Sequence, residues 1–171
     1  GGVSVFAAQF AKMAGASVIA TSSSDEKLER MKELGVDAAI NYRRTPEWDK
    51  EVLELTNGRG VDHVVEVGGA GTFARSVASV ATGGRIAVIG VLTTEGSGVS
   101  PIPVLMRSLR LTGIYVGSRN MFESMIAAIA KNEMLPVIDR VYNLDDPHAA
   151  YEYMDSGKHF GKVVISTTAD R

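Results

Sequence analysis

The chain of 171 residues contains no cysteine and carries a formal net charge of only −2. Without cysteine, these residues can form neither a disulfide bond nor a cysteine-ligated zinc site. The absence of any run of like charges gives no support for nucleic acid or a membrane surface as a partner. No apolar stretch reaches the length of about 18 residues that a membrane-spanning helix needs. This composition fits a cytosolic protein, and we expect a cytoplasmic location.

The start of the chain is rich in small residues and leads directly into a helix. Gly1, Gly2, Val3 and Ser4 precede apolar residues at helical spacing, and residues 17–21 have the pattern of a strand. Glycines that open a helix between two strands are typical of a dinucleotide-binding turn, in which free backbone N–H groups bind a pyrophosphate. The alternative is a tight turn that only packs a helix on a sheet. The strand that should come before such a turn is absent, so we expect a piece of a longer protein.

Strand and helix patterns alternate along the rest of the chain. Strands are predicted at residues 38–41, 62–67, 85–91 and 109–116, and helices at 23–34, 45–57, 72–81 and 118–131. Ser23 and Glu26 suggest a capping box, and Thr45 before Pro46 suggests another helix start. The Val64–Val65 pair suggests a strand buried on both faces. The helix at 118–131 is expected to bury four apolar side chains, namely Met121, Met125, Ile126 and Ile129.

The alternation predicts an α/β fold with a Rossmann-type, doubly wound parallel sheet that lacks its first strand. After Pro136 the rhythm changes to strand, helix and strand, at about residues 137–144, 145–157 and 162–166. These residues are extra strands on the same sheet or a return into a second domain. We interpret residues 1–135 as a nucleotide-binding domain truncated at its N-terminus, and residues 136–171 as a segment that returns to a catalytic domain. Because the absent strand belongs at the centre of the sheet, we expect a gap there or the recruitment of another strand.

The end of the second strand of such a sheet contacts the adenosine ribose. NAD enzymes place a carboxylate there, but this chain has Ser22 and Ser23 at the two possible positions, with Lys27 nearby. Hydroxyl groups and an ammonium suit the 2′-phosphate of NADP. The alternative is that the serines only cap the following helix and Lys27 is a solvated charge.

Ligands of open parallel sheets bind at the carboxyl ends of the strands. The later strands therefore predict a nicotinamide site framed by the following residues: Val67, Gly68, Ile89, Gly90, Val91, Ile114 and Val116.

The order of the motifs resembles the coenzyme-binding half of the medium-chain dehydrogenase/reductase superfamily, which contains zinc-type alcohol dehydrogenases and quinone oxidoreductases. The resemblance covers essentially the whole chain. The matching segments are residues 1–4, 27–29, 34–37, 40–42, 58–62, 65–69, 83–86 and 159–164.

This resemblance implies several roles. In the quinone-reductase branch, residues at the places of Lys27 and Tyr42 contact the 2′-phosphate, which implies NADP with NAD possible. The backbone at Ile89, Ile114 and Val116 would bind the nicotinamide carboxamide. Gly161, with Lys162 beside it, stands where zinc enzymes carry a pyrophosphate-binding arginine, a departure that favours the quinone-reductase branch.

The resemblance also implies that the catalytic machinery lies outside this sequence. We therefore assign no catalytic residue and expect this segment by itself to be inactive. The complete enzyme would transfer hydride to or from a carbonyl, alcohol or activated alkene, and would form a homodimer through the edge strand at residues 109–116. None of the three histidines has a partner at metal-ligand spacing, so we expect no metal site in this chain.

The sequence leaves three alternative classes of protein open. The first is a zinc-dependent, NAD-using alcohol dehydrogenase, which metal ligands upstream would identify. The second is a nucleotide-sensing regulatory domain, which becomes more credible if the segment after Pro136 packs as part of one closed domain. The third is a methyltransferase sheet, which would need an acidic residue at the end of the second strand.

Overall fold

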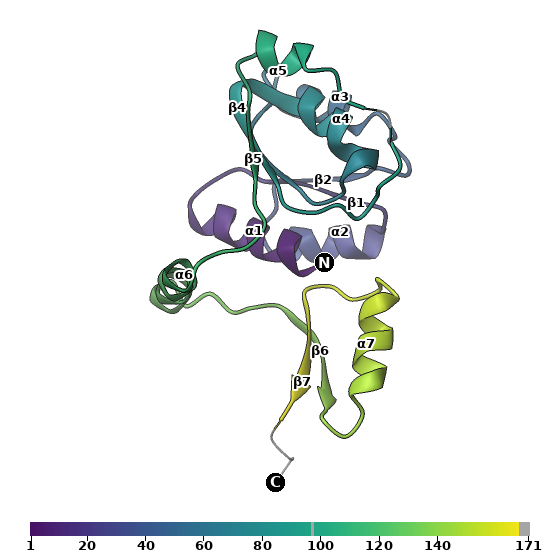
Figure 1. Cartoon of the computed structure of the whole chain (residues 1–171), viewed down its shortest axis with the longest axis vertical. Coiled ribbons are helices and arrows are strands. Elements are labelled where there is room, and N and C mark those ends of the chain that lie inside the picture. The colour runs from purple at the N-terminus through teal and green to yellow at the C-terminus, as the bar shows by residue number, and fades with distance from the viewer. Residues whose placement is uncertain (97, 168–171) are drawn as a thin grey trace. The chain divides into compact units, whose positions relative to one another are not determined.

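The computed structural model describes residues 1–96 and 98–167 (Figure 1). The chain forms two compact units. One unit is Ile19–Phe122, and the other combines Gly1–Val18 with Glu123–Arg171.

The unit Ile19–Phe122 alternates parallel strands with helices, as the sequence predicts. Its strands are β1 (Ile19–Ser22), β2 (Ala38–Asn41), β3 (Val61–Glu66), β4 (Val80–Val88) and β5 (Arg110–Gly113). Its helices are α2 (Asp25–Glu33), α3 (Trp48–Leu55), α4 (Ala70–Ser79) and α5 (Ile102–Met106). All three strand pairs of this unit are parallel. The fold class is therefore α/β, with the strand–helix–strand connections that parallel pairing requires.

The strands of this unit form two separate sheets. β1 pairs with β2, and β3, β4 and β5 form a second sheet in that order. Among the described residues no strand lies hydrogen-bonded between β1 and β3.

Apolar side chains bury the inner faces of both sheets. Ile86 of β4 is 0% exposed. It packs with Val80 of the same strand, with Val77 of α4 and with Leu109. A second cluster beside β2 consists of Ile40, Trp48 and Val52. These clusters fix the strands whose ends form the candidate site.

The helices α2 and α3 begin later than the sequence predicts. The N-cap of α2 is Ser24, whose side chain accepts from the backbone N–H of Lys27 at 3.3 Å, so the predicted capping box at Ser23 is wrong. The N-cap of α3 is Glu47, not Thr45. Both errors are local, since several neighbouring polar residues can each cap a helix and the strand before the helix decides which one does.

Replacing Ser24 with alanine is expected to lower the free energy of unfolding by about 1 kcal/mol, because it removes the acceptor for a helix N-terminal amide. Replacing Ser23 with alanine is the matched control, with an expected change within about 0.5 kcal/mol. Urea unfolding of the complete protein without coenzyme measures both. A larger loss for the Ser23 variant would contradict this capping arrangement.

Three further expectations for this unit need correction. The strand β4 spans Val80–Val88 instead of the predicted residues 85–91, and its register with β3 shifts between Val80 and Arg85. Val65 is 38% exposed, so β3 is not buried on both faces. The strand β5 ends at Gly113, before Ile114. A run of apolar residues identifies a strand but not the elements that cover its faces or the point where pairing stops.

The other unit contains helix α1 (Gly2–Met13) and most of α6 (Arg119–Lys131), followed by β6 (Ile138–Asn143), α7 (Pro147–Asp155) and β7 (Lys162–Ser166). Val5 and Ala8 on α1 are buried, as is Phe160 before β7. β6 and β7 form their own parallel pair, joined by α7, which packs against both strands (Figure 1). They are not strands of the β3–β4–β5 sheet.

The apolar face of α6 is not buried. Met121 is 65% exposed and Ile126 44%, and Met125 and Ile129 are only partly buried. The predicted burial of these four side chains is therefore wrong. Helical spacing shows which face of a helix is apolar, but not whether another element covers that face.

An aromatic contact ties α7 to β6. The Tyr153 hydroxyl donates to Asp139 Oδ2 at 2.7 Å, and the Arg140 guanidinium lies 4.1 Å from the centre of the Tyr153 ring. The hydrogen bond to the Asp139 carboxylate raises the pKa of Tyr153. These contacts stabilise the β6–α7–β7 segment, which carries Lys162 at the start of its last strand.

Candidate functional site

The glycine-rich start forms the N-terminus of α1. Gly1 is the N-cap, its carbonyl accepts from the Val5 N–H at 3.3 Å, and no side chain caps the helix. Gly2 and Val3 therefore supply backbone N–H groups at the positive end of the helix dipole, and the Val3 side chain is 48% exposed. This geometry can bind an anion.

Lys162 lies against this helix start. A Cβ on Gly2 would come within 3.0 Å of Lys162 Nζ, so the glycine leaves room for the ammonium group. Nζ is also 5.6 Å from the centre of the Phe6 ring. A cation opposes the dipole at a helix N-terminus, so this placement favours an additional anion between them. Sequence reasoning noted Lys162 only as a neighbour of Gly161, because the contact with α1 joins opposite ends of the chain.

The ends of β1 and β2 bring Ser22 and Tyr42 together. Ser22 is the register partner of Asn41, and the Tyr42 N–H donates to the Ser22 carbonyl at 3.1 Å. The Ser22 hydroxyl accepts from the Ser24 N–H at 3.2 Å, and the Tyr42 side chain is 39% exposed. The predicted serine and tyrosine therefore share one edge, with Lys27 in the first turn of α2.

The carboxylate of Asp25, at the start of α2, is held by other side chains. Asp25 Oδ1 accepts from the Asn41 amide at 2.7 Å and also from the Arg44 guanidinium. The Asn41 side-chain oxygen in turn accepts from the Arg43 N–H at 3.0 Å. Arg43 is exposed. Arg43 was not predicted, although the available signal was the pair of consecutive arginines that follows β2 after Tyr42.

The backbone segments at the ends of β3 and β4 lie in close contact. The Ile89 N–H donates to the Glu66 carbonyl at 2.8 Å. A Cβ on Gly90 would lie 2.4 Å from the Val67 carbonyl oxygen, so only glycine allows this approach. Val67 and Gly68 therefore lie beside Ile89 and Gly90 at one edge of the sheet.

The end of β5 completes this edge. The Ile114 N–H donates to the Val88 carbonyl at 2.9 Å. With the N–H groups of Ile89 and Ile114 engaged within the sheet, these two residues can offer only their carbonyl oxygens to a ligand. The Val91 and Val116 side chains are 74% and 76% exposed. The edge thus combines backbone acceptors with apolar side chains, which suits a carboxamide on a flat ring.

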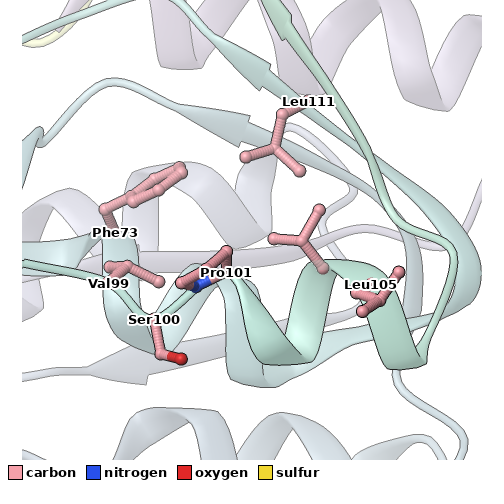
Figure 2. A pocket seen from close by; sticks show the side chains of 7 residues that line it. Phe73, Val99, Ser100, Pro101, Leu105 and Leu111 are labelled. Atoms are coloured by element: carbon pink, nitrogen blue, oxygen red, sulfur yellow. The ribbon is translucent and has the colours of Figure 1, made fainter.

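A separate apolar hollow of about 520 Å³ lies between α4, α5 and β5. Figure 2 shows the side chains of Phe73 and Leu111 facing each other across it, with Ser100 at its margin. The described residues that line this hollow include no titratable side chain. It extends the apolar surface of α5.

The histidines form no metal centre among the residues that the structure describes. His63 is exposed, and His148 Nδ1 lies 3.3 Å from Glu152 Oε1 on the surface of α7. Nowhere in residues 1–96 and 98–167 do three histidine, aspartate or glutamate side chains come close enough to hold a metal ion.

Within the same residues, no helix has the length and apolar character needed to cross a membrane.

The parallel strands, the glycine-opened helix and the polar strand ends define a Rossmann-like α/β protein of the dinucleotide-binding type. Comparison with known proteins agrees. The chain belongs to the Zinc-binding dehydrogenase family, which matches residues 2–131. It corresponds to the coenzyme-binding region of the medium-chain dehydrogenases and reductases.

Three similar proteins illustrate the range of the family. The chain is 47% identical to a zinc-type alcohol dehydrogenase-like protein of Schizosaccharomyces pombe, over 96% of this chain and 49% of that protein. It superposes on a solved NAD-dependent alcohol dehydrogenase with a TM-score of 0.89 and 36% identity, over 98% of this chain and 48% of the other. It also superposes on a mycobacterial protein complexed with NADPH, with a TM-score of 0.79 and 29% identity, over 96% and 54% of the two chains.

The chain spans about half the length of these relatives. It is homologous to NAD(P)-dependent oxidoreductases, among which both coenzymes occur.

Proposed function

We propose that this chain is the coenzyme-binding part of an NADP(H)-preferring oxidoreductase, which transfers hydride to or from a carbonyl, an alcohol or an activated alkene. In this proposal residues 1–135 bind the coenzyme, and residues 136–171 return to a catalytic domain. The nicotinamide carries out the redox chemistry, and this part of the protein binds and orients it.

The observation that carries the proposal is the polar character of the β1 and β2 ends. Ser22, Ser23, Lys27 and Tyr42 offer hydroxyl groups and a cation to a 2′-phosphate, and Arg43 adds a second cation at the same edge. The carboxylate of Asp25 accepts from Asn41 and Arg44, and these hydrogen bonds compete with any bond to ribose hydroxyls.

The other groups take the remaining parts of the coenzyme. Gly1, Gly2 and Val3 bind the pyrophosphate through backbone N–H groups, and Lys162 supplies the compensating cation.

The nicotinamide lies against the residues at the ends of β3, β4 and β5, which are Val67, Gly68, Ile89, Gly90, Val91, Ile114 and Val116. There the Ile89 and Ile114 carbonyl oxygens accept from the carboxamide NH₂ group.

The complete protein is expected to bind NADPH at least about tenfold more tightly than NADH, since charge-assisted bonds to the 2′-phosphate contribute about 1.5 kcal/mol or more. Isothermal titration with each reduced coenzyme measures the ratio. Equal affinities for NADPH and NADH would exclude a role of the serine, lysine and tyrosine side chains in binding the 2′-phosphate. A tenfold preference for NADH would overturn the proposal.

An NAD-dependent alcohol dehydrogenase is the second candidate. It is favoured by the closer similarity to the NAD-dependent structure, at 36% identity, than to the NADPH complex, at 29%. The same titration separates the two, since the second candidate requires tighter binding of NADH.

The exposed edge of β5 supports a homodimer. β5 is the last strand of its sheet, and the chain beyond it exposes Ile114, Tyr115 and Val116, of which Tyr115 is 97% exposed. Leu105 and Met106 on the adjoining α5 are also exposed. Pairing of this edge with a second copy would cover both the strand and these side chains.

A further inference from the structure

The turn that follows β3 is held by a buried carboxylate. Glu66 is 3% exposed. Its Oε1 accepts from the N–H groups of Gly68 and Gly69, at 2.7 and 3.0 Å, and from the Thr72 hydroxyl at 2.7 Å. The Ser76 hydroxyl donates to Oε2. Four donors on one buried side chain compensate its desolvation and fix the backbone around it.

The same turn is held from the β4 side by Thr93. Its hydroxyl donates to the Gly68 carbonyl and accepts from the Gly71 N–H, each at 2.8 Å. Its backbone N–H donates to the Gly68 carbonyl at 2.8 Å, and its carbonyl accepts from Ala70 at 3.0 Å. Gly68–Gly71 is therefore bound on one side by Glu66 and on the other by Thr93.

The backbone of this turn, whose last two residues begin α4, has an unusual conformation at Gly69. Gly69 has φ +86° and ψ −144°, a conformation that is essentially restricted to glycine. A Cβ there would lie 2.6 Å from the Thr93 carbonyl oxygen. Glycine loses more conformational freedom on folding than other residues, and the hydrogen bonds from Glu66 and Thr93 offset that cost at this turn.

We infer that Glu66 and Thr93 are positioning residues, which hold the Gly68–Gly71 turn and the end of β4 in the geometry that receives the nicotinamide ring. This inference rests on the proposed function. Neither side chain needs to touch the coenzyme, because each acts through the backbone that it fixes. The effect is local, so the adenosine end of the site at Ser22 and Tyr42 should not depend on these two residues.

The test compares two ligands on variants of the complete protein. NADPH carries the nicotinamide, whereas 2′,5′-ADP carries only the adenosine half with its 2′-phosphate. Glu66→Ala and Thr93→Val are expected to weaken NADPH binding about tenfold, because hydrogen bonds to the turn are lost, and to change 2′,5′-ADP binding less than about twofold. Glu66→Gln and Thr93→Ser keep acceptors and a hydroxyl in place, and should retain NADPH affinity to within about threefold.

Three outcomes overturn the inference. NADPH binding that is unchanged in Glu66→Ala and Thr93→Val excludes a positioning role, and a parallel loss of both ligands indicates a merely structural one. A wild-type protein that binds neither ligand refutes the proposed function itself, which distinguishes the two failures. If Glu66→Ala does not fold, Thr93→Val still decides the question, since Thr93 is exposed.

Discussion

Replacing Ser22 with aspartate is expected to reverse the coenzyme preference of the complete protein. The ratio of NADPH to NADH affinity should fall at least about 100-fold, because a carboxylate repels the 2′-phosphate and accepts hydrogen bonds from the two ribose hydroxyls of NADH. The fold should tolerate the change, since an aspartate oxygen can accept from the Ser24 N–H as the Ser22 hydroxyl does. Isothermal titration of both coenzymes measures the ratio.

Ser22→Asn is the matched control. Asparagine has the shape of aspartate and can also accept from the Ser24 N–H, but it carries no charge. Its effect on the coenzyme ratio should stay within about fivefold, the range of one neutral hydrogen bond. If the aspartate variant keeps the wild-type preference, the end of β1 does not contact the ribose.

Replacing Gly60 with alanine is expected to lower the free energy of unfolding by about 4 kcal/mol, from left-handed backbone strain and forced separation of packed strands. Gly60 is buried with φ +84°, and a Cβ there would lie 2.7 Å from the Ser79 carbonyl oxygen and 2.8 Å from the Ala81 nitrogen. Both atoms are backbone at the junction of α4 and β4. The start of β3 would have to move away from β4.

Gly58 provides the control within the same loop. Its φ is +79°, close to that of Gly60, but a Cβ there meets nothing within 4 Å. Gly58→Ala should therefore cost only the backbone strain, about 1 kcal/mol. Urea unfolding of both variants separates conformational strain from close packing, and equal losses would show that the contact with β4 has no role.

The strands and helices that could be predicted are those whose sequence signals are local. β2 and β7 have the predicted bounds, and α7 lies within the predicted helix at residues 145–157. The cap of α2 was placed one residue early, because Ser22, Ser23 and Ser24 are chemically equivalent and differ only in how β1 presents them. The open face of α6 was missed because burial depends on a second surface, which helical spacing does not describe.

The candidate site also contains a part that could be predicted from local sequence signals and a part that could not. The edge formed by Ser22 and Tyr42 could be predicted, because both residues lie at the ends of strands that the sequence pattern identifies. Lys162 against Gly2 and Thr93 against Gly68 could not be predicted, since each contact joins residues that no periodic pattern relates. The role of Glu66 was hidden for a different reason. A glutamate at a strand end is ordinarily a solvated charge, and only the four donors around it show that it is a structural anchor.

The division of the parallel strands into β1–β2 and β3–β4–β5 bears on solubility. In the described part of the chain, β1 and β3 each have one strand edge without a pairing partner, and a two-stranded sheet such as β1–β2 is only marginally stable in water. Bare edges of this kind are templates for pairing with other chains. Residues 1–171 produced by themselves should therefore tend to aggregate through these two edges, and adding a segment that pairs with both should do more for solubility than any change of surface charge.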